Sequence, residues 1–187
     1  VKCIACLKAG DYLCIYCEKK LHLRIIGTSD EIYYCFNYDN KIVRQLIYLW
    51  KFRYVSELVE ILGRFLSTII PNDYDFIVPV PTSRVNERGY NQTLLLAKTL
   101  VEETRILDCL IKKNNSPPQS KSNRKMRISN LHGNIVLKSG ASAELVGRTI
   151  LLIDDVIATG ATVNECRRIL KEAGVKKIRV AVLARSC

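Results

Sequence analysis

The sequence predicts an α/β fold in which a mainly parallel sheet is flanked by helices, with a small separate module at the N-terminus. From residue 75 onward, apolar runs typical of strands alternate with segments of helical periodicity. The run Ile150-Leu-Leu-Ile153 is apolar at every position, as in a strand buried on both faces of a parallel sheet. A chain of 187 residues is long enough for one such domain with an appendage.

Cysteine spacing predicts the N-terminal module. Cys3 and Cys6 form one CxxC pair, and Cys14 and Cys17 form a second. Two such pairs supply the four thiolates of a tetrahedral Zn²⁺ site, which leaves no open position for a substrate and is therefore structural. Disulfides and unliganded thiols are the alternatives. We assign residues 1–29 to this module and its connector, and residues 30–187 to the larger domain.

The larger domain is predicted to begin with a strand over residues 31–38, which turns at Asp39-Asn40 into a helix over residues 41–53. A second helix is expected over residues 54–69. Strands are then predicted at residues 75–80, 149–153 and 177–184, and helices at residues 90–104 and 161–173.

The net charge of +11 favours a polyanionic partner such as nucleic acid or a phosphorylated ligand. Residues 112–138 contain basic but no acidic side chains, and the polar stretch 112–130 is expected to be a loop. This loop could close as a lid over a diphosphate, follow a nucleic-acid backbone, or have no specific role. Its candidate contacts are Lys121, Arg124, Lys125 and Arg127.

A second basic group lies on the predicted helix 41–53. Lys41, Arg44 and Lys51 flank Tyr48, a combination that single-stranded DNA sites use for backbone attraction and base stacking. A core helix with a solvated basic face explains the pattern equally well.

The segment that follows Ile153 predicts a site for a phosphorylated ribose. Asp154 and Asp155 come at the carboxyl end of the predicted strand, outside the core, where two carboxylates can accept hydrogen bonds from vicinal hydroxyls. A turn of small residues then enters a helix, whose N-terminal amide groups can bind phosphate. The alternative is a simple strand cap and turn. The residues of this turn are Ala158, Thr159, Gly160, Ala161 and Thr162.

Two arginines after the predicted strand 75–80 could bind further phosphate groups. Arg84 and Arg88 carry guanidinium groups suited to phosphate, and Gly89 permits a backbone conformation that approaches a pyrophosphate closely. A solvated turn with ion pairs to Glu87 is the alternative.

Residues 150–162 resemble the phosphoribosyl-pyrophosphate (PRPP) motif of the type I phosphoribosyltransferases. Further landmarks, together with the four-cysteine module, make nearly the whole chain resemble the ComF family of competence proteins. Two departures are Ala158, where many members have threonine, and Leu131-His-Gly-Asn134, where members often have an aromatic residue. The landmarks are Lys51-Phe52, Val78–Pro81, Arg84, Arg88–Gln92, Gln119, Arg127 and Asn130.

The resemblance implies a type I phosphoribosyltransferase-like fold that binds PRPP with Mg²⁺, and it gives Asp154 and Asp155 the catalytic positions. It also implies a role in natural transformation, in handling incoming single-stranded DNA on the cytoplasmic side, with a helicase or recombination proteins as further partners. An active phosphoribosyltransferase of nucleotide metabolism is the alternative, since binding and transfer use the same residues. Whether the chain is an enzyme stays open here.

The N-terminal residues lack the apolar segment of a signal peptide, and no stretch is long and apolar enough to span a membrane. We therefore expect a cytoplasmic protein, either free or attached peripherally to the inner membrane through partners.

Overall fold

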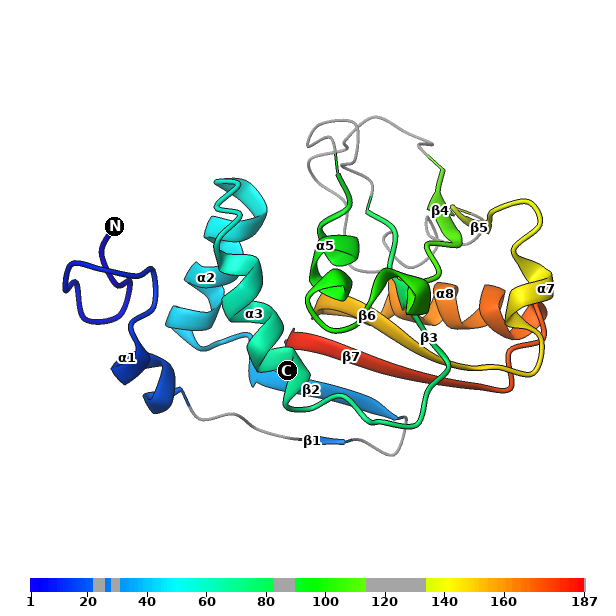
Figure 1. The fold of residues 1–187 in the computed structure, drawn as a ribbon, viewed down its shortest axis with the longest axis horizontal. Coiled ribbons are helices and arrows are strands. Elements are labelled where there is room, and N and C mark those ends of the chain that lie inside the picture. The colour runs from blue at the N-terminus through cyan, green and yellow to red at the C-terminus, as the bar shows by residue number, and fades with distance from the viewer. Residues whose placement is uncertain (22–25, 28–30, 83–89, 114–133, 187) are drawn as a thin grey trace.

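A five-stranded sheet forms the centre of the computed structural model, which describes residues 1–21, 26–27, 31–82, 90–113 and 134–186 (Figure 1). Its strand order is β1-β2-β7-β6-β3. The last four strands in this order are parallel, and β1 joins β2 in the antiparallel sense. The predicted, mainly parallel sheet is therefore confirmed. The strands are β1 (Ile26–Gly27), β2 (Ile32–Asn37), β3 (Phe76–Pro79), β6 (Thr149–Ile157) and β7 (Lys177–Arg185).

Helices cover both faces of this sheet. Successive side chains of β6 point to opposite faces and belong to two different apolar clusters. Leu151 and Ile153 belong to an apolar cluster shared with α2 (Lys41–Phe52), α3 (Leu58–Ser67) and α5 (Gln92–Lys98). Ile150 and Leu152 belong to a second cluster, shared with α7 (Ser142–Leu145) and α8 (Ala161–Glu172). Because both faces are buried, β6 is apolar at consecutive positions.

Several short elements were not predicted because they are too short to show a periodicity. An antiparallel pair, β4 (Leu110–Lys112) and β5 (Ile135–Leu137), flanks the predicted basic loop. The others are α1 (Ile15–Lys20), β1, α7 and a 3₁₀ turn at Glu103–Arg105.

The structure corrects three predicted boundaries. The helix predicted over 54–69 begins only at Leu58, since Tyr54 adopts a left-handed φ of 56° that separates α2 from α3. The helix predicted over 90–104 is confined to Gln92–Lys98. The strand predicted to end at Ile153 continues to Ile157, because β7 goes on pairing with it through Val156↔Ala184.

The N-terminal residues and α1 lie beside α2 and α3 (Figure 1). Cys3, Leu13 and Cys17 are buried in the apolar cluster that contains these two helices. The Glu18 carboxylate of α1 also forms an ion pair with Arg64 of α3, at 3.0 Å. The module is therefore packed against the larger domain. Among the described residues, no helix is long and apolar enough to cross a membrane.

Candidate functional site

A pocket of about 210 Å³ opens where β3 ends and β6 continues. Pro79, the last residue of β3, pairs with Ile153, so the next two residues of β6 have no β3 partner beside them. This unequal strand length exposes one side of Asp154 and Asp155 to the pocket while β7 still holds the other. The lining residues are Lys51, Val80, Pro81, Thr82, Gln92, Thr93, Lys112, Asp154, Asp155, Val156 and Thr162.

The two acidic residues differ in exposure, since Asp154 is half-buried and Asp155 is buried. Asp155 is only 7% exposed, and its Oδ2 lies 2.7 Å from Nζ of Lys51. The expectation that both acids lie outside the core is therefore wrong for Asp155, because β6 extends past Ile153 and carries it inside. Its burial is offset by the ion pair, which joins β6 to the last turn of α2.

Burial raises the pKa of Asp154 from 3.8 to about 7, and the neighbouring charge of Asp155 adds to this effect. The backbone N–H of Asp155, which donates to Asp154 Oδ1 at 2.8 Å, and the charges of Lys51 and Lys112 act in the opposite direction. A carboxyl group with such a pKa can accept or release a proton near neutral pH.

A second hollow of about 110 Å³ adjoins the first and shares Asp154, Val156 and Thr162 with it. It is lined by all five turn residues predicted to bind phosphate, Ala158 to Thr162. Gly160 is the N-cap of α8 and has a φ of 75°, a left-handed conformation that glycine adopts without strain. The amide groups and dipole at the start of this helix favour an anion.

Buried polar side chains fix the walls of the pocket. Gln92 donates from Nε2 to the carbonyl oxygen of Trp50 at 3.0 Å, which ties α5 to α2. Thr93 donates from its hydroxyl to the carbonyl oxygen of Val80, which ties α5 to the segment after β3. Of these two residues, only Gln92 lies among the family landmarks, and no sequence pattern marks Thr93.

One candidate DNA contact on α2, Lys51, lies in the pocket at the end of β6. The sequence groups Lys51 with Lys41, Arg44 and Tyr48, either as a DNA-binding face or as the solvated face of a core helix, but Lys51 lies at the end of α2 and turns into the pocket. Lys41, Arg44 and Tyr48 are exposed on α2, where the Tyr48 ring packs against Phe52 with centroids 5.4 Å apart.

Lys112 also lines the pocket, although in the sequence it stands out only as part of the basic stretch 112–138. The remaining predicted contacts lie outside the described residues. These are Arg84, Arg88, Gly89, Lys121, Arg124, Lys125 and Arg127.

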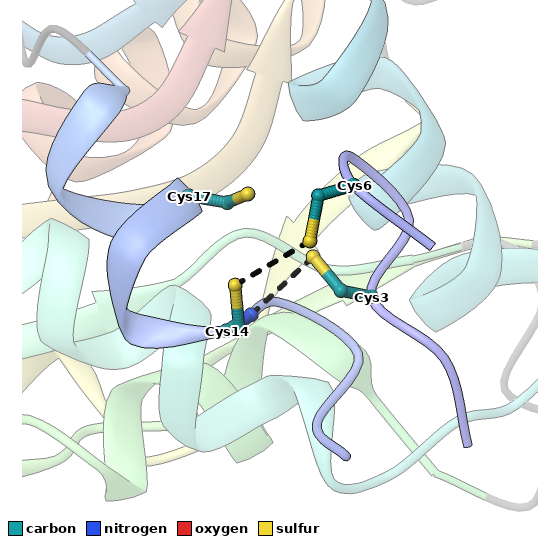
Figure 2. A group of neighbouring side chains, drawn as sticks. All are labelled: Cys3, Cys6, Cys14 and Cys17. Atoms are coloured by element: carbon teal, nitrogen blue, oxygen red, sulfur yellow. Dashed lines mark hydrogen bonds between the residues drawn. The ribbon is translucent and has the colours of Figure 1, made fainter. Parts of the chain in front are cut away.

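The four N-terminal cysteines form a cluster that could hold a metal ion. Their sulfur atoms all lie within 4.8 Å of one another and point toward a common centre (Figure 2). The sulfurs of Cys6 and Cys14 are 3.7 Å apart. A tetrahedral ion with bonds of about 2.3 Å to sulfur requires about 3.8 Å between sulfurs, whereas a disulfide requires about 2 Å. The spacing therefore fits metal coordination.

The electrostatics of the cluster also suit a cation. Burial raises the pKa of Cys3, but backbone N–H groups, including that of Cys14 at 3.5 Å from the sulfur, outweigh it and lower the pKa to about 6. Burial raises the pKa of Cys17 to about 12, with hydrogen bonds to the neighbouring thiols adding to the rise. Four thiolates this close repel one another, so a bound cation is needed for all four to ionise together.

Comparison with known proteins gives two kinds of match. Residues 93–186 match the phosphoribosyl transferase domain family. The chain is 31% identical over 163 residues to competence protein ComFC of Streptococcus pneumoniae, which covers 86% of this chain and 70% of that protein.

Two further relatives match over shorter spans. Competence protein ComFC of Bacillus subtilis is 36% identical over 141 residues, or 72% of this chain and 56% of that protein. Competence protein F of Haemophilus influenzae is 36% identical over 115 residues, or 59% of this chain and 50% of that protein. The match to each of these two relatives thus spans about half of that relative's length.

The raised pKa of Asp154 predicts a stability that falls with rising pH. Between pH 3.8 and about 7 the unfolded chain loses this proton while the folded chain keeps it, so the free energy of unfolding decreases across that window and stays lower above it. Asp154→Asn should therefore stabilise the protein at pH 8 by about 1–4 kcal/mol, a gain that shrinks toward pH 4. Urea unfolding at pH 4 to 8 would measure this.

Asp39→Asn, at an exposed position before α2, is the control and should change the free energy of unfolding by less than about 0.5 kcal/mol. An Asp154→Asn protein that is destabilised equally at every pH would contradict the raised pKa.

Proposed function

Because the chain belongs to the ComF family of competence proteins and carries a phosphoribosyl transferase domain, we propose that it acts in natural transformation, binding PRPP and handling incoming single-stranded DNA in the cytoplasm. The observation that carries the PRPP assignment is the pair of adjoining hollows at the end of β6. One offers a helix N-terminus and the other offers two carboxylates.

In this proposal the parts of PRPP meet groups of matching chemistry. The 5′-phosphate binds at the start of α8, around Gly160, and the ribose hydroxyls donate to Asp154 and Asp155. The diphosphate extends toward Lys51 and Lys112, which line the same pocket. Mg²⁺, which prefers oxygen ligands, would arrive on the diphosphate and neutralise part of its charge.

We further propose that the cysteine cluster binds Zn²⁺ and that the ion has a structural role. Four thiolates are a ligand set typical of structural zinc and leave no coordination position for a substrate. Cys3 and Cys17 are buried against the larger domain, so an ordered module extends the surface formed by α2 and α3.

The exposed face of α2 supports the single-stranded DNA assignment. Lys41 and Arg44 supply positive charge, and the ring of Tyr48, which is 47% exposed, offers a surface for base stacking. The end of this face reaches the pocket through Lys51. Single-stranded DNA bound along the exposed face of α2 would therefore pass beside the PRPP site.

Phosphoribosyl transfer is the second candidate function, and the pKa of Asp154 near 7 favours it, since a group that exchanges protons at neutral pH is common in active sites. Pyrophosphate release from PRPP and Mg²⁺, measured over a panel of nucleobases and with single-stranded DNA, would distinguish transfer from binding alone.

The PRPP assignment predicts that Asp154→Asn weakens PRPP binding without unfolding the protein. At pH 8, above its raised pKa, Asp154 is mostly ionised, so removing this charged acceptor of a ribose hydroxyl should lower the affinity about 10- to 100-fold, because hydrogen bonds to charged groups contribute about 1.5–3 kcal/mol. Isothermal titration calorimetry with PRPP and Mg²⁺ measures the affinity, and the transformation frequency of cells that carry the variant tests the cellular role. Unchanged affinity in the folded variant would refute the assignment.

The metal assignment predicts about one zinc per chain by elemental analysis. Cys6→Ala should abolish stoichiometric zinc and lower the melting temperature, and because Cys6 is exposed, little packing is lost with its side chain. Cys109→Ala, which removes a buried thiol outside the cluster, should keep the zinc. Full zinc content in the Cys6→Ala protein would contradict a four-cysteine site.

The DNA assignment predicts two separable effects on affinity for single-stranded DNA. Replacing Lys41 and Arg44 by alanine should flatten the salt dependence, since each lost phosphate contact reduces the logarithmic slope by about 0.7. Tyr48→Ala should cost about 1–3 kcal/mol of binding free energy at an unchanged slope. Fluorescence anisotropy between 50 and 200 mM salt would measure both effects.

The control replaces two exposed lysines by alanine: Lys171, in the last turn of α8, and Lys176, just after this helix. This double variant should leave the salt dependence of DNA affinity unchanged. Equal effects of the two double variants would show that total charge, rather than the α2 face, attracts DNA.

A further inference from the structure

Lys51 pairs with one of the two carboxylates to which the proposed PRPP site assigns the ribose hydroxyls. Its Nζ lies 2.7 Å from Oδ2 of Asp155, and the side chains are 24% and 10% exposed, respectively. Both residues line the pocket. An ion pair this close competes with a ribose hydroxyl for the Asp155 carboxylate, since Oδ2 already accepts from the ammonium group.

A neutral sugar alone is a poor replacement for this ion pair. A hydroxyl that donates to Asp155 can satisfy the carboxylate, but it offers no counter-charge to the ammonium group that it displaces. A largely buried cation that has lost its partner is strongly unfavourable. A ligand that brings its own negative charge into the pocket removes this cost, because the ammonium group then exchanges one anion for another.

The position of Lys51 allows such an exchange. It lies in the last turn of α2, where the helix dipole favours a cation, and its flexible stem can carry the ammonium group to a second partner nearby. Lys112 adds positive charge to the same pocket. The exchange needs a movement of the Lys51 side chain only. The backbone of α2 stays in place, because Gln92 donates a hydrogen bond to the carbonyl oxygen of Trp50 in its C-terminal turn.

We propose that Lys51 is the specificity-determining residue of the pocket: it selects phosphosugars that carry an anionic group at C1 by leaving Asp155 for that group when the sugar binds. This inference rests on the proposed PRPP site and identifies its ligand class. Ribose 5-phosphate, which lacks the anionic group at C1, should bind much more weakly than PRPP for this reason.

The test compares Lys51→Met with the wild type for two ligands, PRPP and ribose 5-phosphate, by isothermal titration calorimetry in the presence of Mg²⁺. Methionine removes the charge and keeps most of the side-chain volume. PRPP affinity should fall about 10- to 100-fold with the loss of a charged contact. Ribose 5-phosphate affinity should stay the same or rise, because Asp155 is no longer occupied. Lys171→Met, at an exposed position in the last turn of α8 and outside the pocket, should change neither affinity.

A measurement on the wild-type protein covers the case in which Lys51→Met does not fold. Acetylation of Lys51, followed by mass spectrometry, should be faster with saturating ribose 5-phosphate than without ligand, since the displaced ammonium group lacks a partner. With PRPP and Mg²⁺ it should be no faster than without ligand.

Two results would overturn the inference alone while PRPP still binds. One is an equal loss of affinity for both ligands in Lys51→Met, and the other is equal protection of Lys51 by both ligands. If the wild-type protein binds neither ligand, the PRPP site itself is refuted and the role of Lys51 with it.

Discussion

The unequal lengths of β3 and β6 are the constraint on which the candidate site depends. β6 runs four residues beyond its last pair with β3 while β7 keeps its backbone hydrogen bonded. Consecutive carboxylates are thereby held in regular strand geometry yet remain accessible from one side. A rigid strand positions ligand-binding groups more accurately than a loop does, and here it leads within a few residues to the N-terminus of α8. The sugar and phosphate parts of the site therefore share one scaffold.

The sequence predicted those parts of the molecule whose signal is local. The apolar run of β6 and the periodicity of α2 and α8 depend on consecutive residues, and all three elements are present. The four cysteines come together as their spacing implied. What the sequence could not predict is set by distant partners. The extension of β6 depends on β7, and the ion pair between Lys51 and Asp155 joins segments about a hundred residues apart.

Helix α2 connects the features for which we propose functions. Its exposed face carries Lys41, Arg44 and Tyr48, its buried face packs in the cluster that also contains the cysteine module, and its last turn supplies Lys51 to the pocket. Binding at any one of these places acts on the same twelve-residue helix. The helix is therefore a physical route by which DNA, metal and phosphosugar could influence one another, and coupled binding measurements can detect such an influence.

The strand order also bears on synthesis of the protein. β7 lies between β2 and β6, although it is the last of these strands in chain order. On the ribosome, β2 and β6 emerge before the strand that joins them, so the sheet cannot close until its final strand has left the exit tunnel. In a nascent chain, the sheet would thus not hold Lys51, on the helix after β2, beside Asp155 of β6 until β7 has emerged. Premature termination within β7 would leave β2 and β6 without the strand that joins them, so the ion pair between Lys51 and Asp155 would lose its support from the sheet.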